Sequence, residues 1–578
     1  MDRKTIIGMI LIAVIIIAWP FYTKLISPEP VPLKYNKEGA AFKIDTTKSI
    51  SEKRDSVTTK KVTAVDIQKT RTDIPIKENA LWYNAPEKVI SIKSKLYTTK
   101  ISNKSGGTIR EWVLQNYKDG KGSKVNFVES DRNINFSFNY HNQVINLSDA
   151  IFETSSNQSE VDLDYVGNWS ISYTLVFDQT RAIEQTFTFY NDRYDFDVDV
   201  EFKNFGDEVI NSEYQLQWLS GLHSTEKDLQ GDLTYFKAYS LLGDEKEEFD
   251  VTENSSELAF SGLTKWLASR TKYFVLFIIP QEKDGTGCKL KGEAFTKNGT
   301  LDKKEYLLSM SMKFESNKKD RFKFYIGPMD FSTLNKYDEN LTVIMEWGWA
   351  IIRPITKAIL YTFNFLYGII PNYGWVIIVF ALLVRIVLYP LTHKSFVGMQ
   401  KMKEVMPKQK EIQKKFKDNP TKMQQEMMKL YKEVGYNPLS GCLIMFIQLP
   451  ILFPIYQVFN ESLDLRQAPF FGWIKDLSIP DTVAILHTGL PFIGDFHVNP
   501  LPIIMTVLTF IQQKIAPMTP MDNSDPSQKF NQKFLLYGMP IMFFFLFNNF
   551  ASGLVLYWTM FNVLTMAQQL LMAKHVIK

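Results

Sequence analysis

The last apolar run of the chain, residues 534–573, constrains the fold more than any other feature. It contains no charged residue. As one helix it would extend about 60 Å, roughly twice the thickness of the hydrocarbon core of a bilayer. The run therefore has to fold back, and the pairs Asn548-Asn549 and Ser552-Gly553 are suited to the turn. We predict two membrane spans, at 534–550 and 551–573.

Four further apolar runs bring the prediction to six spans, with the others at 1–25, 372–392, 438–460 and 499–517. The first follows Arg3 and Lys4, and no small-x-small cleavage site precedes Pro28. We interpret it as an uncleaved signal anchor, with a cleaved signal peptide as the alternative. The fourth has only about 13 strongly apolar residues, or roughly 20 Å of helix, so it requires a locally thinned bilayer or length from its flanks.

Lysine placement predicts the orientation of these spans. The loop 393–437 holds eleven lysines against five acidic residues, whereas the loop 461–498 holds Arg466 and Lys475 against five acidic residues. Because lysine-rich loops stay in the cytoplasm, the first loop is predicted inside and the second outside. Both termini, the loop 518–533 and the tail 574–578 are then predicted to lie in the cytoplasm.

The polar half of the chain shows a different period. Residues 26–80 are rich in Pro, Lys, Ser and Thr and predict a flexible linker. Across 81–340, apolar residues alternate with polar ones, as at Tyr194, Phe196, Val198, Val200 and Phe202. This pattern predicts an all-β sandwich on the outer side of the membrane. The range 346–370 has aromatic and aliphatic residues at helical spacing, which favours an interfacial amphipathic helix over a helix packed on the sandwich.

Catalytic, metal and cofactor chemistry is not indicated. The two cysteines, Cys288 and Cys442, exclude a disulfide framework, and the six dispersed histidines have no zinc-ligand spacing. No stretch resembles a nucleotide loop, a nucleophile elbow or a paired-carboxylate site. A net charge of +4 without an aromatic-interleaved basic cluster argues against nucleic acid as a partner.

Arg385 is the residue most strongly marked for function. An arginine at the centre of a membrane helix costs about 2.5–3.5 kcal/mol on insertion scales, and the six runs contain no Asp or Glu apart from Asp2 at the start of the first. Either the side chain of Arg385 extends along its helix to bring the guanidinium to the inner membrane interface, or the guanidinium faces water within the bundle. We favour the second. Polar residues in other spans support a hydrophilic groove, although each alone is more often a contact between helices: Gln448, Gln512 and Asn562.

The loop 393–437 predicts a helical hairpin broken before Pro420. One face is rich in methionine, which suits contact with clients or partners, at Met399, Met402, Met406, Met423 and Met427. The alternative is that these residues pack the two helices of the hairpin together.

Several motifs resemble the YidC insertase family in its Gram-negative form with a large periplasmic domain. They occur in the family's order across residues 346–573: Asn372-Tyr-Gly-Trp375 with Arg385 and Tyr389-Pro-Leu-Thr392, Asn437-Pro-Leu-Ser-Gly-Cys442 with Gln448-Leu-Pro450, Trp473-Ile-Lys-Asp-Leu-Ser-Ile-Pro-Asp481, and Ser552-Gly-Leu-Val-Leu-Tyr-Trp558 with Asn562. Arg321-Phe-Lys-Phe-Tyr-Ile-Gly-Pro328 is similar to the end of the family's periplasmic domain. Ala381 departs from members with a polar residue one turn before the arginine.

The resemblance implies a membrane protein insertase and chaperone that acts alone or with the Sec translocon. Its groove would be centred on Arg385 and would include Tyr557 and Trp558. Nascent membrane proteins would be the clients, and the short basic tail makes direct ribosome docking weak. The competing interpretation is a transporter or channel with a sugar-binding outer domain, which would need inverted repeats or converging acid and base groups.

Overall fold

The computed structural model describes residues 85–576 apart from 142, 207–208, 252–253, 298, 338, 346, 349–351, 417–418, 435–439, 488–494 and 516–532. The chain divides into two compact units. The β unit extends to Trp347 and includes Glu461–Leu463, and the helical unit holds Gly348–Asn460 and the chain from Asp464 onward. The predicted signal anchor at 1–25 and most of the predicted linker lie outside the described residues.

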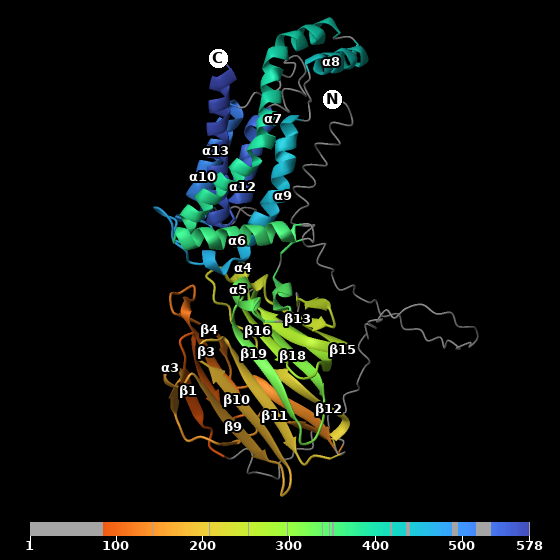
Figure 1. Ribbon diagram of the computed structural model, residues 1–578, viewed down its shortest axis with the longest axis vertical. Coiled ribbons are helices and arrows are strands. Elements are labelled where there is room, and N and C mark those ends of the chain that lie inside the picture. Colours follow the sequence, from red (N-terminus) through yellow and green to blue (C-terminus); the bar gives the residue numbers. More distant parts are fainter. Residues whose placement is uncertain are drawn as a thin grey trace, which may run out of the picture. The chain divides into compact units, whose positions relative to one another are not determined.

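The β unit contains two sheets (Figure 1). The smaller has the order β4-β3-β2-β1-β8, with β1 (Val89–Lys93), β2 (Tyr97–Ser102), β3 (Thr108–Lys118), β4 (Lys124–Glu129) and β8 (Glu160–Asp162). The larger has 14 strands, in the order β6-β5-β12-β18-β17-β15-β16-β19-β11-β10-β9-β7, with β13 paired to β15 and β14 paired to β13.

The strands of the larger sheet have these bounds: β5 (Ile134–Tyr140), β6 (Gln143–Asn146), β7 (Glu153–Thr154), β9 (Asn168–Val176), β10 (Ala182–Tyr190), β11 (Asp195–Lys203), β12 (Val209–Trp218), β13 (Lys237–Leu242), β14 (Glu245–Phe249), β15 (Ser255–Arg270), β16 (Phe274–Pro280), β17 (Gly285–Lys297), β18 (Thr300–Lys313) and β19 (Lys319–Pro328). Short helices stand between some of them: α3 (Leu163–Val166), α4 (Leu229–Leu233), α5 (Phe331–Leu334) and the 3-10 helix η1 (Leu341–Ile344).

The core of the β unit follows from the alternating pattern. On β11, Phe196, Val198 and Val200 are buried. Trp112 of β3 meets Phe196 with ring centroids 5.5 Å apart, so the two sheets share one apolar core. The opposite face of β11 carries acidic residues, and the register places Asp199 opposite Arg321 of β19. The two sheets packed on one core confirm the predicted β sandwich. Alternation could predict it because a period of two fixes which face of each strand is buried.

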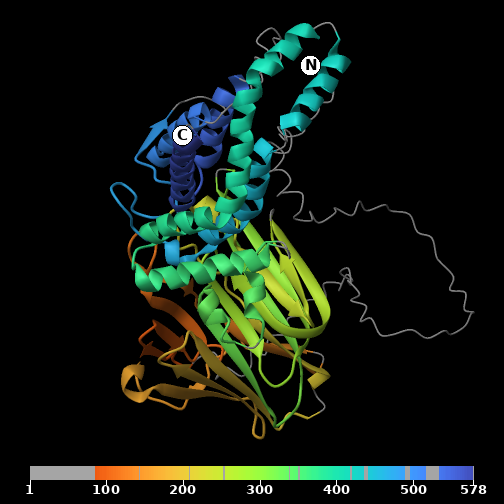
Figure 2. The ribbon, with the colours of Figure 1, turned by 45° about the horizontal axis from the view of Figure 1, so that its top comes forward.

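The helical unit contains seven described α-helices, most of them rich in apolar residues: α6 (Arg353–Ile369), α7 (Tyr373–Lys415), α8 (Pro420–Val434), α9 (Ser440–Glu461), α10 (Pro500–Ile515), α12 (Met539–Phe547) and α13 (Ser552–Val576). It also has a 3-10 turn η2 (Leu463–Leu465), strands β20 (Ala484–His487) and β21 (Asp495–Val498), and a π-helical turn η3 (Phe534–Gly538). The helices α7, α9, α10, α12 and α13 run side by side, and α6 lies across one end of them (Figures 1 and 2).

The structure departs from the sequence-based division at 392–393. The second predicted span and the first helix of the hairpin form one continuous helix, α7, of 43 residues. Pro390 and Pro407 lie inside it without ending it. No glycine or asparagine, the usual residues at a helix C-terminus, directly follows Pro390. The helix therefore continues past residue 392, where the sequence changes from apolar to polar.

By length and hydropathy, two of the described helical segments could cross a membrane, Tyr373–Pro390 and Ser552–Met572. Leu536–Phe547 is a shorter apolar helix. The chain reverses between α12 and α13 at residues 548–551, which include Asn548-Asn549, and Ser552-Gly553 begins α13. The number of six spans therefore stays a prediction.

Candidate functional site

Arg385 lies on the buried face of α7. Its residue is only 5% exposed, and the guanidinium carbon is 5.3 Å from the centroid of the Phe561 ring on α13. Ala381, one turn earlier, is also buried, so the small side chain leaves the arginine close to its neighbouring helix. The guanidinium therefore points into the bundle and stacks on an aromatic face, an arrangement that stabilises a cation by about 0.5–2 kcal/mol.

Helix α13 presents polar residues to three neighbouring helices. Tyr557 is buried with its ring between those of Phe380 on α7 and Phe459 on α9, at 6.0 and 6.5 Å. Asn562 donates from Nδ2 to Thr509 Oγ1 of α10 over 2.9 Å, and both residues are buried. Polar and cationic groups from α7, α10 and α13 thus lie within a short stretch of the bundle.

Some predicted groove residues are brought together and others are not. Arg385, Tyr557 and Asn562 share this stretch. Trp558 turns instead toward α12, with its ring 5.3 Å from that of Phe547, and Gln512 is half-buried on α10. The side chain of Gln448 lies outside the described part of the chain.

Thr509 and Phe561 are contacts that sequence reasoning missed. From sequence, a threonine in an apolar helix is expected to donate its hydroxyl to a backbone carbonyl of the same helix. Thr509 Oγ1 does donate to the Met505 carbonyl at 2.8 Å. Its second role, accepting from Asn562, depends on how α10 and α13 are rotated. The one available signal was its position three residues before Gln512, on the same side of α10.

Residues 463–481, here called the capping loop, tie together the first turns of two helices. Asp481 Oδ2 accepts from the Leu501 backbone N–H at the start of α10 and from Trp473 Nε1, each at 2.8 Å. At the start of α13, the N–H groups of Ser552 and Gly553 donate to carbonyls of Ile479 and Leu477. The bonds from Leu501, Ser552 and Gly553 satisfy backbone N–H groups that a helix leaves unpaired at its N-terminus. The capping loop therefore joins the starts of α10 and α13.

The described part of the cytoplasm-predicted hairpin is held by side-chain packing. Leu430 of α8 is buried, and Met423 and Met427 on the same helix are half-buried. Gln409 Nε2 of α7 donates to the Tyr431 hydroxyl at 2.5 Å. Met428 remains exposed. The side chains of the other three predicted contact residues, Met399, Met402 and Met406, lie outside the described part of the chain.

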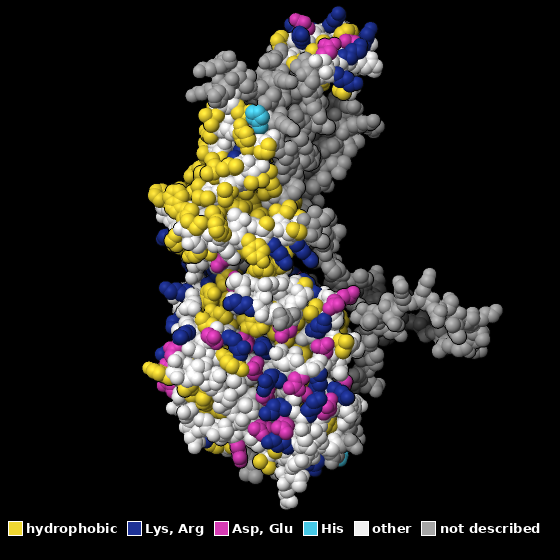
Figure 3. All heavy atoms as spheres, viewed as in Figure 1, with side chains coloured by type: hydrophobic (Ala, Val, Ile, Leu, Met, Phe, Trp, Pro, Cys, Tyr) yellow, Lys and Arg dark blue, Asp and Glu magenta, His cyan; other side chains and the backbone are white. Residues whose placement is uncertain are grey.

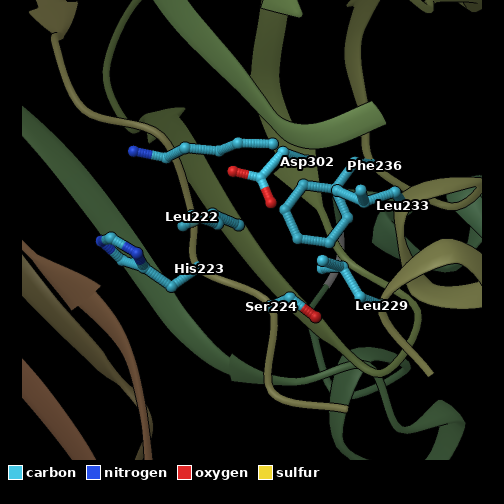
Figure 4. A pocket seen from close by; sticks show the side chains of 8 residues that line it. Leu222, His223, Ser224, Leu229, Leu233, Phe236 and Asp302 are labelled. Atoms are coloured by element: carbon cyan, nitrogen blue, oxygen red, sulfur yellow. The ribbon is translucent and has the colours of Figure 1, made fainter. Parts of the chain in front are cut away.

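The β unit has a cavity of about 220 Å³ beside α4 (Figure 4). Leu222, Leu233 and Phe236 form its apolar side, while His223, Asp302 and Lys303 supply polar groups. The lining therefore includes one carboxylate, whereas glycoside hydrolysis uses two flanking the bond. Among the described residues, no group of three or more His, Cys, Asp or Glu is arranged to hold a metal ion.

Behind this cavity, Asp232 of α4 is fully buried. It accepts hydrogen bonds from the Ser224 hydroxyl and the Lys272 backbone N–H. Burial raises the pKa of the Asp232 carboxyl to about 6, against the opposing effect of the Ser224 hydrogen bond. This carboxyl is therefore partly protonated at mildly acidic pH.

Comparison with known proteins covers both units. Residues 365–578 match the family model described as 60Kd inner membrane protein, and residues 89–361 match the model described as YidC periplasmic domain. The membrane protein insertase YidC of Chlorobaculum tepidum is 35% identical over 579 residues, covering 98% of this chain and 94% of that protein. The insertase of Chlorobium limicola is 34% identical over 584 residues, with the same coverage. These matches extend the resemblance noted from motifs to almost the whole chain.

Proposed function

The chain belongs to the YidC family of membrane protein insertases, and from this premise we propose that Arg385 is the centre of a hydrophilic groove through which it inserts clients. Family membership makes it an inner-membrane protein with a periplasmic domain, whose activity is the insertion of other membrane proteins. The relatives give no support to a transporter or channel.

The burial of Arg385 beside α13 is the observation that carries the proposal. An arginine inside an apolar bundle is costly, so its retention points to a use in function. Tyr557, Asn562 and Thr509 add polar groups within the same stretch of the bundle. In this environment a cation attracts an acidic residue of a client far more strongly than it would in water.

Insertion then needs no covalent step and no nucleotide. A polar client segment enters the groove from the cytoplasm, while the client's apolar helix moves along the outside of the bundle into lipid. Burial of that helix supplies the free energy, at about 25 cal/mol per Å² of apolar surface. The short helix α10, about 24 Å long, favours a thinned bilayer and a shorter remaining path.

The orientation and partners follow from charge and packing. Six spans with both termini in the cytoplasm place the lysine-rich hairpin of α7 and α8 inside and the β unit in the periplasm. Met428 and the methionines before it offer soft contacts for clients or for the Sec translocon.

The test is insertion into liposomes by the purified full-length protein, scored as protease protection of the acidic tail of a single-span client. We expect Arg385→Ala to lower protection roughly tenfold, equivalent to about 1.4 kcal/mol of lost attraction, and Arg385→Lys to retain most of it. Arg353→Ala on α6 removes an exposed arginine of the same unit and serves as the matched control.

The outcomes separate the insertase from its groove. Full activity of Arg385→Ala, with a client that wild type inserts, would contradict the role of the arginine. Protection no better than in empty liposomes for every client tested, with folded wild-type protein, would contradict autonomous insertion. A loss that is equal in Arg353→Ala would mean that net charge, and not the buried site, is responsible.

A further inference from the structure

The hairpin of β20 and β21 exposes apolar side chains on both of its faces. Ile485 is 48% exposed and Leu486 is 53% exposed, and Val483 just before them is exposed as well. Successive residues of a strand point to opposite faces, so Ile485 and Leu486 lie on different faces of the hairpin. A hairpin surrounded by water would place polar residues on at least one face.

The exposure does not come from a loose attachment. Phe496 of β21 stands opposite Leu486 in the register, and its ring centroid is 6.2 Å from that of Phe544 on α12. Asn548 donates from Nδ2 to the His497 carbonyl at 3.0 Å. The hairpin is therefore fixed to the end of α12 while its apolar side chains remain uncovered by the described chain.

The hairpin continues the apolar surface of the two shortest helices of the bundle. α10 exposes Ile503, Ile504 and Val507, and α12 exposes Ile541 and Phe545. α10 extends about 24 Å, and η3 with α12 about 20 Å, against a hydrocarbon thickness of roughly 30 Å.

The hairpin also lies at the end of the bundle that α6 crosses. In Figure 1 it projects sideways from this end, and Figure 3 shows hydrophobic side chains covering much of the helical unit on the face viewed. α6 exposes Tyr361, Phe365 and Ile369. Two elements at one end of the bundle, one helical and one β, thus present apolar side chains beyond the ends of the membrane helices.

We infer that the β20–β21 hairpin is a lipid-binding element that lies in the headgroup region of the bilayer, with Ile485 and Leu486 in contact with lipid. Continuity with the apolar faces of α10 and α12 identifies lipid as the occupant. The two strands have unpaired edges, which hydrocarbon cannot satisfy but headgroups and interfacial water can, so the hairpin lies at the interface and not in the membrane core. The inference requires the helical unit to be in the membrane but does not require the groove.

The test places a fluorophore on each face of the hairpin in the full-length protein. Leu486→Cys and Ile485→Cys, each with Cys288→Ser and Cys442→Ser, are labelled with NBD and reconstituted into nanodiscs that carry nitroxide lipids. The nitroxide is placed either near the headgroup or deep in the acyl chain. We expect both positions to emit at shorter wavelength than in water and to lose more intensity to the headgroup-proximal nitroxide.

Two matched sites calibrate the measurement. Val144→Cys on β6, where the residue is 73% exposed, should emit as in water, and Val507→Cys on α10 should lose most intensity to the deep nitroxide. Water-like emission at 485 and 486, equal to that at 144, would overturn the inference. An emission shift that arises only when a client is added would overturn it too, because the hairpin would then bind a client strand. Client insertion by the same samples is scored separately, so failure of the groove would not be mistaken for failure of the hairpin.

Discussion

Asp195 in the β unit and Arg385 in the helical unit are both buried charges, but their surroundings differ. Asp195 is 0% exposed. Its Oδ2 lies 3.5 Å from Arg193 Nη2 and 3.7 Å from Lys323 Nζ, and its Oδ1 accepts a hydrogen bond from the Tyr337 hydroxyl. The guanidinium carbon of Arg385 lies 5.3 Å from the centroid of the Phe561 ring. The β unit surrounds this charge with three partners, two of them from distant parts of the sequence, whereas the helical unit places its arginine against an aromatic face.

Threonine hydroxyls repeat this contrast. In the helical unit many of them donate to the carbonyl four residues back in their own helix: Thr356, Thr362, Thr392, Thr506, Thr509, Thr559 and Thr565. In the β unit Thr99 of β2 donates to the Glu111 carbonyl of the neighbouring strand β3. A helix offers a threonine hydroxyl the carbonyl one turn earlier in the same chain segment, whereas Thr99 on an extended strand reaches a carbonyl of the neighbouring strand.

The largest test of the comparison is Asp195→Ala. It leaves two cations and a phenol in the β unit without their shared carboxylate, and loss of one partner of a buried ion pair costs about 3–5 kcal/mol. Hydrogen exchange of β11 and β19 in the full-length protein measures the change in unfolding free energy. Asp244→Ala removes a 98% exposed carboxylate paired with Lys265 and should leave exchange unchanged. Equal effects of the two would break the comparison.

The Asp232→Asn variant tests whether the ionised Asp232 carboxylate lowers the stability of the β unit despite its two hydrogen bonds. Folding raises the pKa of Asp232 from about 4 to about 6, so the folded state holds the proton more tightly. The stabilising contribution of this group is therefore full below pH 4, falls as the pH rises through 6, and stays low above it.

In the Asp232→Asn variant, the introduced amide oxygen can still accept from the Lys272 backbone N–H, and the Ser224 hydroxyl can reverse its role. The variant should match wild type near pH 4 and exceed its stability by about 3 kcal/mol at pH 7.5. Denaturant unfolding of the β unit at several pH values measures this difference. A constant difference across the range would show that packing, and not ionisation, dominates at this position.

The smallest effects come from one substitution made in both units. Thr99→Val removes a hydrogen bond between strands and should cost about 1 kcal/mol of β-unit stability. Thr559→Val removes a bond within α13 that duplicates a satisfied backbone carbonyl, and should cost less than about 0.5 kcal/mol. Hydrogen exchange follows the first, and unfolding in mixed detergent micelles follows the second. A larger loss in α13 would reverse the comparison.

Patterns in the sequence were enough to specify the two kinds of structure and to single out Arg385. Alternation at 194–202 predicted the buried face of β11, and the uncharged run at 534–573 required a reversal, because each period fixes a residue's position relative to its own strand or helix axis. Arg385 stands out because it is the one charged residue in the apolar run 372–392. Family motifs then led to the insertase interpretation, which the comparisons support over nearly the full chain.

Which polar groups meet was settled by the folded molecule alone. Tyr557 and Trp558 are neighbours in sequence, yet one faces α7 and α9 and the other faces α12. Thr509 accepts from Asn562, 53 residues away, and Asp195 accepts from Tyr337, 142 residues away. Periodicity fixes a side chain's direction around its own axis but not the rotation of that axis against its neighbours, which is set by packing of the whole unit.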